Sequence, residues 1–337
     1  MDAHAVPPQA TILNVVAGFW LSRAVFLAAK LKLADLVGDD PVSLETLARK
    51  MTARPEALRR LMRALTSNGI FHEEADGTFV QSAVSEALRS GRPGSVRGLA
   101  EAELGRDHYE AWGKVETCLA EAGTAFERVY AMPVWDYYAK HPELAALFGE
   151  AMTNLTGISN AGVLKSYDVA PFRKAVDVGG GQGSFLAAIL DKHRDAEGVV
   201  FELPSVVATA GGVAGRSDRL TLQSGDFFKE VPAGADLYLL KFVLHDWDDQ
   251  ACIRILSNIR QAIAANGRLL LVEQLLPAAN EHHISPLMDL NMMVMTGGNE
   301  RSVEQYEQLL TASGFRLDGV ATTHSPFSVL EASPAAG

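Results

Sequence analysis

The sequence predicts an α/β fold: a doubly wound, mostly parallel sheet covered by helices, preceded by a helical winged-helix domain. Two observations favour this class. From about residue 173, apolar runs of strand length alternate with helical patterns, which is typical of a parallel sheet. Residues 43–80 carry the signals of two short helices and a hairpin. We expect one domain over residues 1–100 and a second over 101–337, which begins with a helical linker region.

Composition and charge limit the partners of the chain. Its 337 residues are 48% hydrophobic, enough to form two compact cores. The formal net charge of −11 argues against nucleic acid or an anionic membrane as the main partner. Cys118 and Cys252 have neither metal-ligand nor disulfide-framework spacing. Because the N-terminus lacks a signal-peptide pattern and no run of about 18 apolar residues occurs, we expect a soluble, cytoplasmic protein.

Residues 11–37 predict one helix with apolar residues on every side. Its large apolar side chains are Phe19, Trp20, Val25, Phe26, Leu31, Leu33 and Leu36. Such a helix carries more apolar surface than its own domain can cover, and a contiguous exposed apolar patch marks an interface. We therefore expect this helix to form an interface.

The next segment predicts a winged helix. Ser43 can cap a helix that continues to Lys50, and Pro55 falls in the first turn of a second helix. The apolar face of that helix comprises Leu58, Leu61, Met62 and Leu65. Asn68-Gly69 ends the helix, and Asp76-Gly77 is the turn of a hairpin.

A winged helix has two interpretations, DNA recognition and dimerisation. DNA recognition is favoured by the arginines of the second helix, which are Arg54, Arg59, Arg60 and Arg63. Residues 1–100 contain 12 Lys+Arg against 10 Asp+Glu, a net charge of only +2, which supplies little counterion-release free energy. A dimerisation domain is the interpretation we prefer.

Residues 95–165 predict helices throughout and are rich in aromatic residues: Tyr109, Trp112, Phe126, Trp135, Tyr137, Tyr138 and Phe148. The strands that follow are expected at 175–178, 198–202, 219–223, 236–244 and 268–273. A frayed tail is expected near Pro334.

The most informative stretch is DVGGGQGSF at 177–185, a glycine turn between a strand and a helix. Bare backbone at such a turn approaches a nucleotide-like cofactor. A dinucleotide fingerprint needs a sixth-position glycine, and Ser184 stands there instead. Glycines at the first, third and fifth positions favour S-adenosylmethionine, so we assign Asp177, Gly179 and Gly181 to its site. A glycine turn that binds nothing is the alternative.

Ligands of open α/β sheets gather at the carboxyl ends of the strands, and polar residues follow the next three strands. Glu202, 19 residues after Gly183, can accept both ribose hydroxyl protons. Asp226 offers a carboxylate to the adenine amino group and Phe227 an aromatic face. Lys241 ends the fourth strand.

His245 and Glu273 carry the expected chemistry. A histidine at the carboxyl end of a strand in a cofactor-binding sheet is a candidate base, and Glu273, at the end of the fifth strand, can brace its tautomer. The acidic residues Asp246, Asp248 and Asp249 could bind magnesium, but all lie in one loop. A helix N-cap is the better interpretation, so no metal is expected.

A methionine-rich helical segment precedes Gly297-Gly298. Met288, Met292 and Met295 can be core residues, or adaptable walls for a flat aromatic ligand. Asn291 among them is a candidate polar contact for such a substrate.

Nearly the whole chain resembles the S-adenosylmethionine-dependent small-molecule O-methyltransferases of the plant caffeate and isoflavone type and their bacterial antibiotic-tailoring relatives. The shared motifs are DVGGGQGSF (177–185), FELP (201–204), GDFF (225–228), KFVLHDWDD (241–249) and GGNER (297–301). The resemblance implies a Rossmann-like class I methyltransferase fold. It also implies an intertwined homodimer in which Trp20 lies near the partner's acceptor pocket.

The resemblance also implies residue roles. The residues that would contact the cofactor are Gly179, Glu202, Asp226, Phe227 and Lys241. His245 would be the base, flanked by Glu273 and Glu300, and Met152 would line the cavity near the reactive methyl. Glu202 replaces the aspartate of the plant enzymes, and the segment before Gly297 departs from the plant pattern, so the acceptor stays open.

These features predict a metal-independent enzyme that methylates the hydroxyl of a small phenolic, polyketide- or phenazine-like aromatic acceptor, with His245 taking the proton. Three alternatives stay open: a winged-helix regulator that senses a ligand, a cofactor-binding relative that no longer methylates, and an enzyme that methylates nitrogen.

Overall fold

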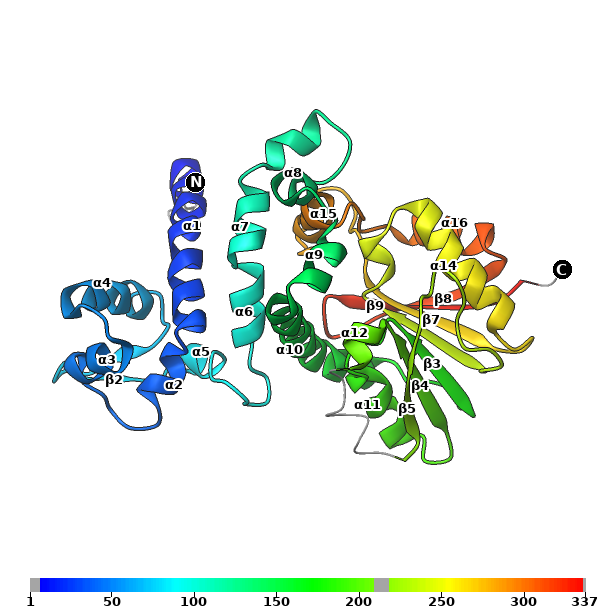
Figure 1. The fold of residues 1–337 in the computed structure, drawn as a ribbon, viewed down its shortest axis with the longest axis horizontal. Coiled ribbons are helices and arrows are strands. Elements are labelled where there is room, and N and C mark those ends of the chain that lie inside the picture. Colours follow the sequence, from blue (N-terminus) through cyan, green and yellow to red (C-terminus); the bar gives the residue numbers. More distant parts are fainter. Residues whose placement is uncertain (1–6, 209–217, 336–337) are drawn as a thin grey trace, which may run out of the picture. The chain divides into compact units, whose positions relative to one another are not determined.

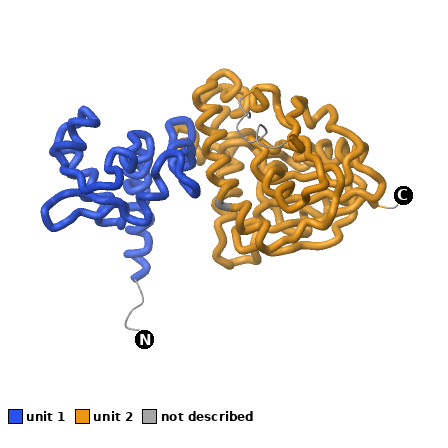
Figure 2. The backbone as a smooth tube through the Cα atoms, turned by 90° about the horizontal axis from the view of Figure 1, so that it is seen from below, with its two compact units in different colours: residues 1–108 blue, residues 109–337 orange. Residues whose placement is uncertain are grey.

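The computed structural model describes residues 7–208 and 218–335, and the chain divides into two compact units, Met1–His108 and Tyr109–Gly337 (Figure 2). The division falls after His108, whereas the sequence analysis places it after residue 100. Helix α6 (Arg97–Glu103) packs against α1 (Pro8–Lys30), and this packing keeps residues 101–108 with the first unit.

The first unit contains helices and one small hairpin. After α1 come α2 (Leu33–Val37), α3 (Leu44–Met51), α4 (Pro55–Thr66), β1 (His72–Glu73), β2 (Phe79–Val80), α5 (Ala83–Glu86) and α6. The expectation of a single helix over 11–37 is wrong, because Lys32 adopts a left-handed φ of 51° and separates α1 from α2. Ser43 caps α3 by accepting the Thr46 N–H, and β1 and β2 pair antiparallel.

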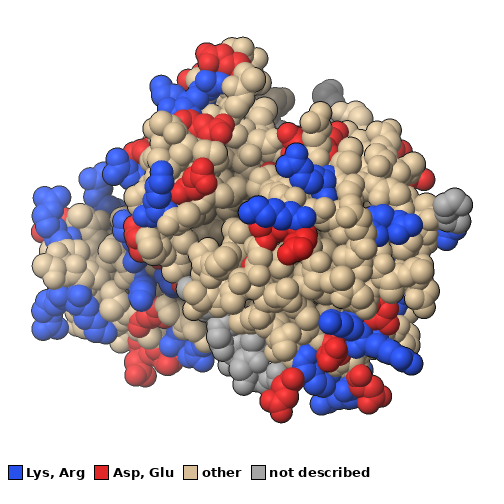
Figure 3. All heavy atoms as spheres, turned by 45° about the vertical axis from the view of Figure 1, so that its right-hand side comes forward, with Lys and Arg blue, Asp and Glu red and all other residues tan. Residues whose placement is uncertain are grey.

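Helix α1 leaves a long apolar surface uncovered within its unit. Its exposed large side chains are Ile12, Leu13, Val15, Val16, Phe19, Trp20 and Leu27. By length and composition alone this helix could cross a membrane, but a helix that a partner covers passes the same test. Charged groups of both signs are interspersed on the face of the molecule in Figure 3.

The second unit opens with helices. They are α7 (Arg106–Trp112, which begins before the division), η1 (Val115–Leu119), α8 (Ala125–Tyr130), α9 (Val134–Lys140) and α10 (Pro142–Ser166). Helical structure over 95–165 is therefore interrupted, for example by the turn before Thr124, which caps α8. Phe126, Tyr138 and Val294 belong to one apolar cluster here, so the aromatic residues of this region form a core of their own.

A seven-stranded sheet with the order β5-β4-β3-β6-β7-β9-β8 follows (Figure 1). Its strands are β3 (Lys174–Val178), β4 (Glu197–Glu202), β5 (Leu220–Ser224), β6 (Leu237–Lys241), β7 (Arg268–Gln274), β8 (Phe315–Thr322) and β9 (Phe327–Pro334). Strands β3 to β7 pair in parallel, and β9 runs antiparallel between β7 and β8. The doubly wound, mostly parallel fold class is confirmed.

Helices cover both faces of this sheet. The helices that follow β3 in the chain are α11 (Ser184–Lys192), α12 (Pro204–Val207), η2 (Leu244–Asp246), α14 (Asp249–Ala262), α15 (Ser285–Met295) and α16 (Val303–Ala312). Side chains of α14 and α16 pack on one face with Val176, and those of α10 and α11 pack on the other with Ala175. Pro334, near which a frayed tail was expected, ends β9, and residues 336–337 lie outside the described residues.

Candidate active site

The glycine turn lies between β3 and α11. Gly179 and Gly183 have φ of 70° and 78°, a region that residues with a Cβ rarely adopt. A Cβ would also lie 2.9 Å from Val243 Cγ2 at Gly179 and 2.8 Å from Val200 Cγ2 at Gly183. Glycine is therefore required at both positions, by its φ and by the close packing of the turn on these two valines.

A buried carboxyl lies below this turn. Asp177 is 1% exposed, and neither carboxyl oxygen has a hydrogen-bond partner among the described residues. Burial raises its pKa to about 7, while the positive charge of Lys241 opposes that rise. An unsatisfied buried carboxyl is costly, and a cationic ligand above it would lower the cost, as S-adenosylmethionine with its sulfonium and ammonium charges would.

Two further groups lie at the carboxyl edge of the sheet. Burial raises the pKa of Glu202 to about 7, and its Oε2 accepts the Leu203 N–H at 3.0 Å. Burial lowers the pKa of Lys241 to about 8, and its Nζ lies 3.3 Å from Thr156 Oγ1 of α10. Thr156 belongs to none of the motifs read from the sequence.

The loop after β5 holds Asp226 and Phe227. Asp226 Oδ1 accepts the Phe228 N–H at 2.9 Å, and its Oδ2 lies 3.3 Å from Lys229 Nζ. The Phe227 ring lies with its centroid 6.0 Å from that of Trp247, edge to face. The loop is thus fixed by its own contacts and holds an aromatic ring beside the turn that contains His245.

His245 lies in η2, just beyond β6, and is 3% exposed. Its Nδ1 lies 2.9 Å from Glu300 Oε1, and its Nε2 lies 3.7 Å from Asp246 Oδ1. The imidazole also packs on Phe242, with ring centroids 3.8 Å apart. When Glu300 is ionised, Nδ1–H donates to it, which leaves the Nε2 lone pair available as a base.

Glu273 contacts the backbone just before His245. Glu273 Oε1 accepts the backbone N–H groups of Val243 and Leu244 at 3.2 and 2.9 Å, so this carboxyl fixes the chain that leads into His245. Glu300 is the carboxyl that contacts the ring. Burial raises the pKa of Glu273 to about 7 and that of Glu300 to about 8.

The candidate acceptor residues are divided between the units. Met152 on α10 and Met288 on α15 are partly buried. Met292 is 6% exposed and packs within its own helix end, where its sulfur accepts from Thr296. Asn291 Oδ1 accepts the Trp112 indole N–H at 2.9 Å. Trp20 belongs to the first unit, where it is 67% exposed.

The acidic loop after His245 is explained by local contacts. Asp248 Oδ1 accepts the Ala251 N–H at 2.8 Å and caps α14, and Asp249 Oδ1 accepts from Arg301. The N-cap interpretation is confirmed. Within residues 7–208 and 218–335, no group of three or more His, Cys, Asp or Glu is arranged to hold a metal ion.

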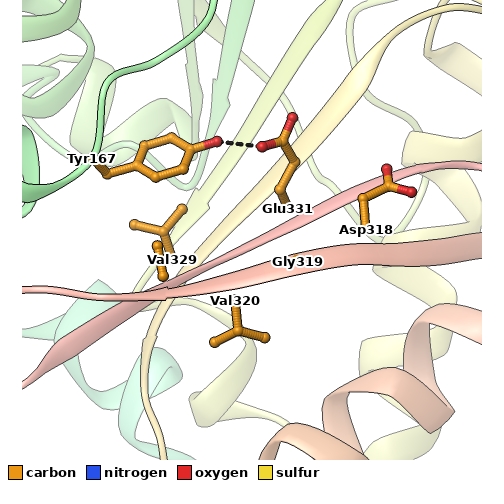
Figure 4. A pocket seen from close by; sticks show the side chains of 7 residues that line it. Tyr167, Asp318, Gly319, Val320, Val329 and Glu331 are labelled. Carbon is orange, nitrogen blue, oxygen red and sulfur yellow. Dashed lines mark hydrogen bonds between the residues drawn. The ribbon is translucent and has the colours of Figure 1, made fainter.

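A separate hollow of about 350 Å³ lies against β8 and β9 (Figure 4). Its lining residues are Tyr167, Asp318, Gly319, Val320, Ala321, Val329 and Glu331. The Tyr167 hydroxyl donates to Glu331 across it. Because none of the candidate cofactor or acceptor residues lines this hollow, we do not assign the reaction to it.

The fold and the groups at the carboxyl edge of the sheet define the class of S-adenosylmethionine-dependent methyltransferases. Residues 112–316 match the model of the O-methyltransferase domain, and residues 13–91 match that of the O-methyltransferase dimerisation domain. The chain therefore belongs to the O-methyltransferase family, and the resemblance inferred from its motifs is confirmed.

Three known proteins illustrate the match. The chain is 40% identical, over 98% of both chains, to phenazine O-methyltransferase PhzM of Lysobacter antibioticus. It is 31% identical, over 92% of both chains, to phenazine-1-carboxylate N-methyltransferase of Pseudomonas aeruginosa. Human N-acetylserotonin methyltransferase, solved in complex with S-adenosylmethionine, matches the whole chain with a TM-score of 0.92 at 25% identity. S-adenosylmethionine is the cofactor of this chain.

Proposed function

We propose that the protein methylates a hydroxyl group of a small, flat aromatic acceptor, with His245 as the general base. The observation that carries this proposal is the buried contact of 2.9 Å between His245 Nδ1 and Glu300 Oε1. A paired carboxylate fixes the imidazole in the tautomer whose Nε2 can accept a proton. The O-methyltransferase similarity and the phenazine-directed relative support the acceptor class.

S-adenosylmethionine supplies the electrophilic methyl group. His245 Nε2 would take the acceptor's hydroxyl proton as the oxygen bonds to the methyl carbon, the methyl–sulfur bond would break to release S-adenosylhomocysteine, and Glu300 would stabilise the imidazolium. A free phenol near pKa 10 and a free imidazole near 6.5 differ by about 3.5 units, an uphill transfer of about 5 kcal/mol. Stabilisation of the imidazolium by a buried carboxylate offsets part of this cost.

The cofactor roles are proposals of the same kind. Glu202 would accept from the ribose hydroxyls, Asp226 from the adenine amino group, and Phe227 would stack on the adenine ring. Asp177 and Lys241 would lie below the methionine part, beside the turn of Gly179 and Gly181. The unsatisfied oxygens of Asp177 support a cationic ligand at this place.

We further propose that Met152, Met288 and Met292 adapt to a flat acceptor and that Asn291 orients it. Because Asn291 Oδ1 already accepts from Trp112, its amide N–H groups are left to bind the acceptor. An acceptor with a carbonyl or carboxylate beside the methylated position would satisfy them.

Nitrogen methylation is the second candidate, favoured by the similarity to a phenazine-1-carboxylate N-methyltransferase. A pyridine-type ring nitrogen, such as that of a phenazine, carries no proton to remove, so its methylation needs no base. The buried His245–Glu300 pair therefore supports oxygen.

The dimer is also a proposal: α1 would pack against a second copy of the chain, with Trp20 near the partner's acceptor pocket. The uncovered apolar side chains of α1 and the dimerisation-domain match support it. Removal of residues 1–25 should yield a monomer in sedimentation that still binds the cofactor but loses acceptor affinity. A truncated monomer with full activity would contradict the dimer proposal.

The test of function is methyl transfer itself. Methyl-labelled S-adenosylmethionine is incubated with a panel of flat phenols, quinones and phenazines, and the product is examined by NMR. We expect label on a phenolic oxygen. Label on a ring nitrogen would favour the second candidate, and no label on any member would contradict the acceptor class.

A further inference from the structure

A buried guanidinium joins the turn of His245 to the loop of Glu300. Arg301 is 1% exposed. Its Nη1 donates to the carbonyl of Leu244 at 3.1 Å, and its Nη2 donates to the carbonyl of Trp247 at 2.8 Å. These two carbonyls belong to the residues on either side of His245-Asp246. The Arg301 side chain therefore binds the turn that contains His245 at both of its ends.

Arg301 is also held by contacts other than those with Leu244 and Trp247. Its carbonyl accepts the Leu276 N–H at 3.0 Å, just beyond the end of β7. Its Nη1 also donates to the Asn299 carbonyl at 3.1 Å, and its Nε and Nη2 donate to Asp249 Oδ1 at 3.0 and 2.8 Å. Every nitrogen of the guanidinium thus donates a hydrogen bond, and the planar group can make all of these bonds in one orientation only.

The two segments are also in direct backbone contact at Gly298. A Cβ at this position would lie 2.0 Å from the carbonyl oxygen of His245 and 2.6 Å from the backbone nitrogen of Trp247. Only glycine allows this approach, because the clashing atoms are backbone and cannot rotate away. The neighbouring Glu300 N–H donates to Asp289 Oδ1 at 2.9 Å, which fixes the carboxyl-bearing residue on its other side.

We propose that Arg301 is a positioning residue that sets the contact between His245 and Glu300 by holding the carbonyls of Leu244 and Trp247. The inference rests on the proposed function, in which His245 is the base. Arginine is required because its planar fork reaches both carbonyls and Asp249 at once, whereas a lysine ammonium is a single point donor.

The charge of Arg301 has a second effect. It favours the ionised form of Glu300 and so opposes burial, which dominates and raises the pKa of that carboxyl. The other charged or titratable groups around this site are His245, Asp246, Asp249 and Cys252 of α14, Asp289 of α15, Glu273 of β7 and Tyr306 of α16. Loss of the guanidinium charge should raise the pKa of Glu300 further.

The test compares Arg301→Met and Arg301→Lys with Arg268→Met in the full-length protein. Arg268 is a matched control: its Nη2 also donates to two backbone carbonyls, those of Ala170 and Pro171. Arg268 is the first residue of β7 and lies about 17 Å along this strand from Glu273. Circular dichroism and calorimetry with S-adenosylmethionine verify that each variant is folded and binds the cofactor.

We expect Arg301→Met to lower kcat roughly 10²-fold, the effect of a misplaced catalytic group, with cofactor affinity within about threefold of wild type. The acid limb of its pH–rate profile should move up by about one unit. Arg301→Lys should keep the limb near its wild-type position and recover part of kcat, and Arg268→Met should match wild type.

If Arg301→Met does not fold, Gly298→Ala tests the same contact with the guanidinium retained: it should lower kcat without moving the acid limb. Wild-type kcat in either folded variant would overturn the inference, and so would a lower kcat in Arg301→Met with an unmoved acid limb. Failure of the proposed function is recognised separately, because His245→Ala would then also retain full activity in the same assay.

Discussion

Replacement of Glu300 by glutamine isolates the charge that faces the imidazole. The amide keeps the shape of the carboxyl and an oxygen that can accept from His245 Nδ1, but it cannot stabilise a positive ring. In the structure this oxygen lies 2.9 Å from Nδ1, and Glu300 is 1% exposed. Solvent screening of the pair is therefore weak.

The magnitude follows from this geometry. Two unit charges 4 Å apart attract by about 4 kcal/mol at an effective dielectric constant of 20, and desolvation of the carboxylate offsets part of that. Hydrogen bonds to charged groups contribute about 1.5–3 kcal/mol to stability. At 1.36 kcal/mol for each factor of ten in rate, Glu300→Gln should lower kcat about 10- to 150-fold.

The assay is the single-turnover rate with labelled cofactor at several pH values. Burial raises the pKa of Glu300 to about 8, so the wild-type carboxyl is ionised above that pH and protonated below it. The deficit of Glu300→Gln should be largest above about pH 8 and shrink as the pH falls, because the wild type then loses the same charge.

Glu331→Gln is the matched control. Glu331 is a partly buried carboxylate that accepts from Tyr167 beside the hollow at β9 and takes no part in the candidate active site (Figure 4). It should retain the wild-type rate. A Glu300→Gln rate within about twofold of wild type at high pH would refute the claim that this charge stabilises the imidazolium.

Three further outcomes are expected. Glu202→Ala or Asp226→Ala should weaken S-adenosylmethionine binding by about 1–3 kcal/mol in calorimetry, and unchanged affinity in both would remove these residues from the site. EDTA should leave the rate unchanged, whereas inhibition that magnesium reverses would revive a metal site in the loop after His245. The melting temperature of the cofactor-free protein should fall from about pH 5 to 8. Burial raises the pKa of Asp177, Glu273 and Glu300, so the unfolded state binds fewer protons than the folded state in this pH range. A rise in melting temperature would contradict the burial of these carboxyls.

Much of the fold could be predicted because the signals are local. Ser43, Pro55 and the turn at Asp76-Gly77 each act within a few residues of themselves, and the alternation of strands and helices is visible in the chain. Strands β8 and β9 were missed because β9 joins the sheet by pairing with β7, which is distant in the sequence, and β8 pairs in turn with β9. The break between α1 and α2 was missed because Lys32 is not a residue that usually adopts a left-handed φ.

The residues of the candidate site that follow the strands could be predicted, whereas the contacts between these residues could not. Glu202 and Lys241 follow from topology, because the carboxyl ends of parallel strands share one edge. The resemblance placed both Glu273 and Glu300 beside His245, but the sequence does not show which carboxyl contacts the ring, since that contact spans a gap of 55 residues. Arg301 stands in the GGNER motif, but nothing in the sequence shows which carbonyls it binds.

The most direct test of the central claim is the rate and cofactor affinity of His245→Ala. General-base removal typically lowers the rate by about 10²–10⁴-fold, and the imidazole acts on the acceptor's proton rather than on the cofactor. We expect a fall in kcat of that size with S-adenosylmethionine affinity nearly unchanged in calorimetry. A variant that methylates the acceptor at the wild-type rate, or that loses cofactor binding in parallel with its rate, would contradict the assignment of His245 as the base.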